Sequence, residues 1–211
     1  KKGGHEEILS AFAGGRADIL IGTQMIVKGH DFPNVTLVGV LAADLSLYTP
    51  DFRCGERTFQ LLTQAAGRAG RDRLAGEVLI QTYNPDHYSI RCAAAQDYPS
   101  FYRQEMVYRG MLRYPPACQM MSVLASCGSE ELLDEAVNDL NLWAGQACAG
   151  KAVQMIGPAQ ATIYKANDIY RKILYLKDEN YVILIQLKND MEEKSRQAAW
   201  HGHVMVQYDF A

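Results

Sequence analysis

Val35-Thr-Leu-Val-Gly-Val-Leu-Ala42 is a short apolar run bounded by polar and turn-forming residues, and Ala17-Asp-Ile-Leu-Ile-Gly22 upstream has the same character. Both are continuously hydrophobic rather than alternating, which is typical of parallel strands buried on two faces. Glu77-Val-Leu-Ile-Gln-Thr-Tyr83 predicts a third strand. Helical spacing of apolar residues marks His5–Phe12 and Thr58–Ala66. Strands that alternate with helices predict an α/β fold built on a parallel sheet.

The pattern changes after Pro85. Residues 87–112 predict one or two helices, interrupted near Tyr98-Pro99. Tyr114-Pro115-Pro116 ends any helix, because proline lacks a donor and restrains the residue before it. We therefore expect three segments, namely the latter part of an α/β domain over residues 1–85, a helical connector over 86–116 and a small C-terminal domain over 117–211.

The C-terminal segment predicts the order strand, helix, strand, strand, helix, strand. Ser129 is the expected N-cap of its first helix, since its hydroxyl can accept a backbone hydrogen bond. The second helix is predicted over 181–194; Val182–Ile185 favours a strand by propensity, whereas the length and polar second half favour a helix. The expected strands are Met120–Ser126, Val153–Ile156, Tyr170–Leu176 and His203–Tyr208. This order predicts a split βαβ, α+β domain of ferredoxin-like type.

Composition limits the class of protein. The 211 residues contain no apolar stretch of the roughly 18 residues that a membrane span needs, and the opening residues do not form a signal peptide. Five cysteines, an odd number without a Cys-x-x-Cys pair, favour reduced thiols in a cytoplasmic protein over disulfides or a zinc site. The net charge of −3 means that any contact with nucleic acid must come from local patches.

The octet Gln64-Ala-Ala-Gly-Arg-Ala-Gly-Arg71 is the first candidate site. Arg68 and Arg71 lie three residues apart and are therefore neighbours on a helix or on the turn that ends one. Gly67 and Gly70 have no side chains, which lets a bulky polyanion approach. A guanidinium group offers rigid forked donors and a permanent charge, which suit a triphosphate. The alternative interpretation is a surface helix with solvated arginines.

A second candidate is the loop Gly22-Thr-Gln-Met-Ile-Val-Lys-Gly-His-Asp-Phe-Pro33, which follows a predicted strand. Ligands of α/β sheets gather beyond the carboxyl ends of strands. Thr23 offers a hydroxyl and a backbone donor for a phosphodiester oxygen. Asp31 can accept a hydrogen bond from a ribose hydroxyl, and Lys28 can reach a phosphate. The alternatives are a plain glycine turn and, for Lys28, a solvated side chain.

The loop, the strand after it and the arginine-ended helix together resemble motifs V and VI of superfamily 2 helicases. The sequence is most similar to the PriA family of replication-restart DNA helicases, and the similarity covers essentially all 211 residues. The stretches that carry it are Asp18-Ile-Leu-Ile-Gly-Thr-Gln-Met25, Lys28-Gly-His-Asp-Phe-Pro-Asn-Val-Thr-Leu-Val38, Glu56-Arg-Thr-Phe-Gln-Leu-Leu-Thr-Gln64, Arg113-Tyr-Pro-Pro116 and Tyr170-Arg-Lys-Ile-Leu-Tyr-Leu-Lys177, the last preceded by Gly157-Pro-Ala159.

The resemblance implies roles for residues of the first domain, a partial second RecA-like helicase lobe. Arg71 matches the arginine finger, with Arg68 beside it on the γ-phosphate of ATP, and Gln64 links the nucleotide to the cleft. Gly29 and Asp31 match residues near the nucleotide. Thr23 matches a residue that holds a DNA phosphate.

The C-terminal domain is expected to contact DNA. Residues 165–177 carry a net charge of +3, and tyrosines interleave with the cations. Aromatic faces can stack on bases while cations follow the backbone. The expected contacts are Lys165, Tyr170, Arg171 and Lys172. The alternative is a solvated strand edge with core tyrosines.

As a whole, the resemblance implies the C-terminal portion of an ATP-dependent 3′–5′ DNA helicase of primosome assembly. The chain has no Gly-x-x-x-x-Gly-Lys-Ser/Thr loop. ATP and Mg²⁺ are therefore expected to bind mainly to another lobe, zinc to an upstream insert, and the chain alone is not expected to hydrolyse ATP. Expected partners are forked, branched or single-stranded DNA, other primosome proteins and single-stranded-DNA-binding protein, with no membrane. The alternatives are a non-enzymatic module that binds branched DNA and docks primosome proteins, and a RecG-like translocase of superfamily 2.

Overall fold

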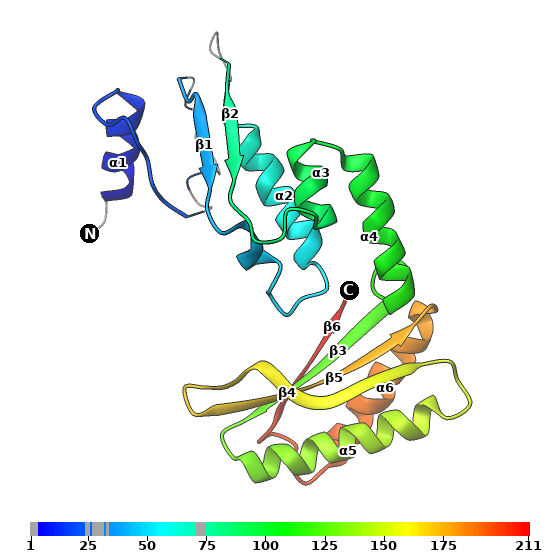
Figure 1. The fold of residues 1–211 in the computed structure, drawn as a ribbon. Coiled ribbons are helices and arrows are strands. Elements are labelled where there is room, and N and C mark those ends of the chain that lie inside the picture. Colours follow the sequence, from blue (N-terminus) through cyan, green and yellow to red (C-terminus); the bar gives the residue numbers. More distant parts are fainter. Residues whose placement is uncertain (1–3, 24–25, 27–31, 33, 71–74) are drawn as a thin grey trace. The chain divides into compact units, whose positions relative to one another are not determined.

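The computed structural model describes residues 4–23, 26, 32, 34–70 and 75–211 (Figure 1). The chain divides into two compact units, Lys1–Glu105 and Met106–Ala211. Each unit has its own cluster of buried hydrophobic side chains. The two units are therefore described one at a time.

The first unit combines helices with a parallel pair of strands, as predicted (Figure 1). The two strands are in register, with Leu37 opposite Glu77 and Val40 opposite Ile80. Helix α4 begins in this unit and ends in the second. The elements are α1 (Gly4–Ala13), β1 (Leu37–Val40), the 3-10 helix η2 (Ala43–Ser46), α2 (Cys54–Ala66), β2 (Glu77–Ile80), α3 (Tyr88–Ala94) and α4 (Tyr98–Leu112).

Helix α2 supplies the centre of this unit's core. Phe59 and Leu62, three residues apart on one face of α2, are both buried. The ring of Phe59 stacks on Phe101 of α4 with centroids 4.2 Å apart, and Ile90 of α3 joins the same cluster. Aromatic stacking adds about 0.5–1.5 kcal/mol to the burial of such rings. Helix α2, whose end carries the octet, is thus held firmly.

The strand predicted over 17–22 is not formed. Residues 19–22 have no regular secondary structure, and Ile19 and Ile21 are 77% and 87% exposed. A hydrophobic run becomes a buried strand only where another strand pairs with it and a layer covers it. Among the described residues β1 pairs with β2 alone, so this run has neither.

The second unit is a four-stranded antiparallel sheet with two helices on one face (Figure 1). Its strand order is β4-β5-β3-β6, with each helix connecting two strands that are not neighbours. This is the split βαβ arrangement that the sequence predicted. The elements are β3 (Gln119–Cys127), α5 (Glu130–Cys148), β4 (Gln154–Ala166), β5 (Ile169–Asp178), α6 (Tyr181–Gln197) and β6 (Met205–Phe210).

The core of the second unit lies between the sheet and its helices. Leu174 and Leu176 of β5 pack with Leu133 of α5 and Leu184 of α6. The ambiguous segment after residue 180 is a helix, and the Asn180 side chain caps it by accepting a hydrogen bond from the backbone of Val182. An amphipathic face and a cap therefore outweigh the strand propensity of the residues that follow.

Strands β4 and β5 form a hairpin with a two-residue turn. Asn167 and Asp168 have φ angles of 51° and 57°, as in the mirror-image turns that suit the twist of paired strands. Lys165 is paired with Tyr170 directly beside the turn. Further along, the register shifts twice, once on each side of Gln160. Strand β4 is therefore longer than the predicted strand at 153–156 and irregular in the middle.

Candidate functional site

The end of α2 carries Gln64 and Arg68. The helix closes with two backbone hydrogen bonds of 3.0 Å, from Gly67 to the carbonyl of Thr63 and from Arg68 to the carbonyl of Ala65. Gln64 is exposed and Arg68 is half-buried. Side chains four residues apart on a helical turn are neighbours, so these two polar groups share one end of α2.

The turn after Arg68 is tied to both strands. The backbone N–H of Gly70, at a φ of 67°, donates to the carbonyl of Val35, just before β1, over 3.0 Å. Gly76, just before β2, packs so closely that a Cβ atom there would lie 2.3 Å from the Gly70 nitrogen. Because backbone lies against backbone at both contacts, the described residues just after Arg68 are held against the segments that precede β1 and β2.

The other predicted nucleotide contacts, Gly29, Asp31 and Arg71, lie outside the described residues, as does Lys28. Thr23 is described and exposed. Its carbonyl oxygen accepts a hydrogen bond of 3.1 Å from the backbone of Ile26. The loop thus contributes one described site residue.

A buried carboxylate that the sequence analysis missed lies just beyond β1 and β2. Asp44 is 4% exposed and accepts hydrogen bonds from the hydroxyl of Thr82 over 2.6 Å and from the backbone of Tyr83 over 2.9 Å. The Thr82 hydroxyl, followed by the Tyr83 amide, holds the pKa of Asp44 below its ordinary value. Its partners lie 38 and 39 residues away in the sequence, so no local sequence motif predicts this buried carboxylate.

In the second unit, Lys165 and Tyr170 meet beside the hairpin turn. The Lys165 Nζ donates to the Tyr170 hydroxyl over 2.9 Å and lies 4.4 Å from the centre of its ring. Lys165 also forms an exposed ion pair of 3.5 Å with Asp168. The bond to Tyr170 is the main reason that the pKa of Lys165 is raised.

Tyr164 ties the same cluster to α5. Its ring lies edge-on to Tyr170, with centroids 5.6 Å apart, and its hydroxyl donates to the carboxylate of Glu130 in the first turn of α5. This hydrogen bond is the main factor that raises the pKa of Tyr164 to about 12. Two of the site's aromatic rings and one cation thus form a connected cluster at the hairpin end.

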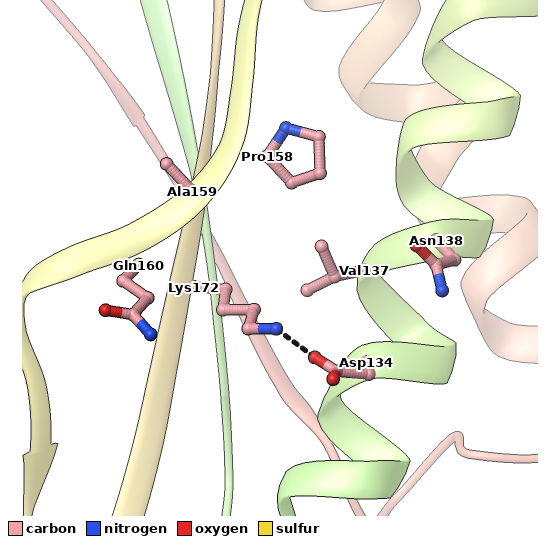
Figure 2. A pocket seen from close by; sticks show the side chains of 7 residues that line it. All are labelled: Asp134, Val137, Asn138, Pro158, Ala159, Gln160 and Lys172. Carbon is pink, nitrogen blue, oxygen red and sulfur yellow. Dashed lines mark hydrogen bonds and ion pairs between the residues drawn. The ribbon is translucent and has the colours of Figure 1, made fainter.

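Arg171 and Lys172 lie on opposite faces of β5, because side chains alternate along a strand. Lys172 is on the face that packs against the helices and forms an ion pair with Asp134 of α5 (Figure 2). Arg171 is on the other face, where it donates to the carbonyl of Ile169 over 3.4 Å. The structure therefore brings Lys165, Tyr170 and Lys172 to the helix-bearing side of the sheet and separates Arg171 from them.

Lys177, which contributed to the charge expected of this stretch, is 2% exposed. Its Nζ donates to the carbonyl of Leu112 over 3.1 Å and faces the ring of Tyr114. Burial lowers its pKa. A buried ammonium group cannot contact a DNA backbone. The basic surface formed by residues 165–177 is therefore smaller than the sequence suggested.

The five cysteines are all free thiols. No helix of the described residues is both long and apolar enough to cross a membrane. Within the same part of the chain, no three His, Cys, Asp or Glu side chains are grouped as metal ligands.

Two family models match the chain. The model described as "Helicase conserved C-terminal domain" matches residues 1–73, and "Primosomal protein N C-terminal domain" matches residues 110–209. Three similar relatives carry the name "Replication restart protein PriA". That of Bacillus subtilis (strain 168) is 45% identical over 99% of this chain and 26% of its own length. That of Chlamydia pneumoniae is 41% identical over 89% and 25%, and that of Treponema pallidum is 37% identical over 94% and 30%. The chain thus spans about a quarter of the length of the curated relatives it matches.

Proposed function

The chain belongs to the PriA family of replication restart proteins and corresponds to its C-terminal region, and we propose that it serves an ATP-dependent 3′–5′ DNA helicase. In this proposal the first unit supplies the arginines that contact ATP, and the second unit binds DNA. The RecG-like alternative does not account for the match to the C-terminal domain over residues 110–209.

The observation that carries the proposal is the fixed turn after α2. An arginine that stabilises a transferring phosphoryl group must be positioned before the reaction, because reorganisation at that moment would reduce its effect. The backbone around Arg68 is held by the Gly70–Val35 hydrogen bond and by the close packing of Gly76. Gln64 lies one helical turn earlier. These residues fit a phosphate group, for which Arg68 and Arg71 would provide charge-assisted hydrogen bonds.

This role can be tested in the full-length protein. We expect Arg68→Ala and Arg71→Ala each to lower DNA-stimulated ATP turnover by about 10³-fold, the lower end of the range for an arginine finger, with little change in DNA binding. Arg57→Ala is the matched control, since Arg57 lies on the same helix and pairs with Asp51 over 2.8 Å. Equal loss of turnover and of DNA binding would mean that the arginines are structural. The 211-residue chain alone is expected to show no turnover.

DNA binding by the second unit rests on the cluster beside the hairpin turn. Lys165 and Tyr170 place a cation and an aromatic ring together, and Arg171 adds a cation on the other face of β5. Fluorescence anisotropy with forked and single-stranded DNA at several salt concentrations tests this. Lys165→Gln is expected to weaken binding and to reduce the salt slope by about one phosphate contact. Lys188→Gln on α6, where Lys188 pairs with Glu192, is the control.

The alternative of a non-enzymatic DNA-binding and docking module keeps one supporting observation, because the second unit has its own core and sheet. Contacts with primosome proteins and with single-stranded-DNA-binding protein belong to the same proposal. The double variant Arg68→Ala, Arg71→Ala of the full-length protein separates the two roles. If it keeps both fork binding and ATP turnover, the proposed helicase role of this region is wrong and the docking role remains.

A further inference from the structure

Helix α2 is fastened at its start as well as at its end. The hydroxyl of Thr58, in the first turns of α2, lies 2.7 Å from the hydroxyl of Ser46 at the end of η2. Each hydroxyl also has a backbone carbonyl within reach, that of Cys54 at 2.8 Å from Thr58 and that of Ala43 at 3.0 Å from Ser46. Whichever hydroxyl donates to the other, the second can donate to its own carbonyl. Thr58 is fully buried, so water does not compete for this contact between η2 and α2.

The 3-10 helix η2 is itself held at the end of β2, and Asp44 makes most of the contacts. The Asp44 carboxylate accepts hydrogen bonds from the hydroxyl of Thr82 and from the backbone of Tyr83. The backbone of Ala43 donates to the carbonyl of Gln81 over 3.0 Å. Because its two ends bond to different elements, η2 connects the end of β2 to the start of α2.

The residue that leads into η2 has a strained backbone. Ala42 has φ and ψ angles of 50° and 52°, which is the left-handed region. A side chain other than glycine costs free energy there and persists only where the surrounding structure determines the conformation. The bonds from Asp44 and Ala43 to the segment after β2 can offset that cost. The placement of η2 is therefore determined by these contacts and not by the local preference of the chain.

Directional contacts at both ends determine how α2 is oriented. Between the ends, Phe59 and Leu62 are buried in the core, but hydrophobic burial has no preferred direction. Hydrogen bonds weaken steeply when they are misaligned, so the bonds at Thr58 resist a rotation or a slide of the helix. Ala66, the last residue of α2, lies about 12 Å along the helix axis from Thr58. A displacement at the start of so short a helix reaches Arg68, which follows directly after its end.

We propose that Asp44 is a positioning residue for ATP hydrolysis, acting through η2 and the Ser46–Thr58 contact to orient α2 and the arginine turn after it. Asp44 touches neither ATP nor DNA in this proposal. Its loss would misplace Arg68 when charge develops on the transferred phosphoryl group, where a preorganised donor has its largest effect. The inference rests on the proposed function, because it requires Arg68 to act on a phosphate group.

Two variants of the full-length protein break this connection at different points. Asp44→Asn places an NH2 group against backbone N–H groups at the end of β2, and Thr58→Val removes one hydroxyl and keeps the shape of the side chain. We expect each to lower the kcat of DNA-stimulated ATP hydrolysis by about 10-fold, less than the roughly 10²-fold that a 1 Å misplacement can cost. The KM for ATP and the affinity for DNA should not change, because the effect falls on the transition state. Turnover is measured well below the unfolding temperature of each variant.

Asp97→Ala is the matched control. The Asp97 carboxylate accepts a hydrogen bond of 3.0 Å from the backbone of Ser100 at the start of α4. Its removal takes a helix cap from the same unit, which lowers stability, but the lost bond joins neither η2 nor α2. We therefore expect the kcat of this variant to equal that of the original protein. If Asp97→Ala lowered kcat as much as Asp44→Asn does, the effect would come from lost stability and the inference would be wrong.

The same substitutions in an Arg68→Ala, Arg71→Ala background show what Asp44 acts through. We expect no further loss of the residual turnover, measured with enzyme in excess over ATP. A further 10-fold loss, or single variants of Asp44 and Thr58 with unchanged kcat, would overturn the inference while the proposed function stands. If the arginine variants themselves kept full turnover, the proposed function would be wrong and this inference with it. Should Asp44→Asn fail to fold, Thr58→Val decides the outcome.

Discussion

The ammonium group of Lys177 lies 3.5 Å from the centre of the Tyr114 ring. It also donates to the carbonyl of Leu112 at the end of α4. The residues just before β3 are thus fastened to β5 by a buried cation. A cation desolvated over an aromatic face gains about 2 kcal/mol or more, against roughly 0.5–1 kcal/mol at an exposed site.

A double-mutant cycle measures this contact. Tyr114→Leu alone should lower the free energy of unfolding, because it leaves the buried ammonium over an aliphatic group. Lys177→Met should be milder, since it keeps the stem and removes the cost of burying the charge. We expect a coupling energy of about 1–2 kcal/mol from urea denaturation of the two single variants and the double variant. Additive effects would mean that the ring and the cation do not stabilise each other.

Gly76 should be irreplaceable by alanine. The added Cβ would lie 2.3 Å from the nitrogen of Gly70 and 2.4 Å from the carbonyl carbon of Ala69, and backbone atoms cannot move aside cheaply. We expect Gly76→Ala to lower the stability of the first unit by about 2 kcal/mol or more. The same substitution at Gly145 in α5, where a Cβ meets nothing within 4 Å, should stabilise the protein by about 0.5–1 kcal/mol. Thermal unfolding of the two variants decides the matter, and a stable Gly76→Ala protein would contradict the close packing.

Asp44→Asn should unfold at a lower temperature than the original protein at neutral pH, by about 4 °C or more, because a charged acceptor is lost from a buried network. The pKa of Asp44 is below its ordinary value in the folded state, so the carboxylate stabilises the fold above the unfolded pKa. That contribution disappears as the pH falls through the folded pKa. The difference in Tm should therefore be constant above about pH 5 and narrow below about pH 4. Asp86→Asn, at an exposed position in the segment after β2 that also carries the Asp44 partners Thr82 and Tyr83, should change the Tm little at neutral pH.

Ser129→Ala should cost the second unit about 1 kcal/mol, the usual effect of removing an N-cap. The Ser129 hydroxyl accepts the backbone hydrogen bond of Leu132 over 3.2 Å. Ser129→Asp should retain most of the stability, because a carboxylate caps equally well and favours the positive end of the helix. If both variants lost the same amount in urea denaturation, capping would not be the cause.

Periodicity was sufficient where one face of an element is buried. The buried stripe of α5 around Leu133, the alternation of β5 around Leu174 and Leu176, and the order of elements in the second unit all follow from it. The prediction of a strand at 17–22 was wrong for a related reason. Hydrophobicity alone does not make a strand, and the described residues contain no partner strand for this segment. Strand β4 was underestimated because an exposed, bent edge strand leaves no regular pattern.

The candidate sites were predictable only in part. The resemblance proposes Gln64 and Arg68 as site residues, a role that stays a prediction, and the structure adds the close contact between Gly76 and Gly70 just after Arg68. The burial of Lys177 could not be foreseen, since its hydrogen-bond partner lies 65 residues earlier in the chain. The sequence analysis did not single out Asn167-Asp168, the two-residue turn of the hairpin that places Lys165 beside Tyr170.

That two-residue turn also decides which way neighbouring cations point. Side chains alternate strictly along β5, so inserting or deleting one residue at Asn167-Asp168 would shift the pairing by one position and exchange the two faces. Arg171 would then face α5 and Lys172 the opposite side, while the leucines that follow would leave the core. The length of the turn therefore has to match the face of β5 on which Leu174 and Leu176 are buried, and this burial determines which face carries Lys172 and which carries Arg171.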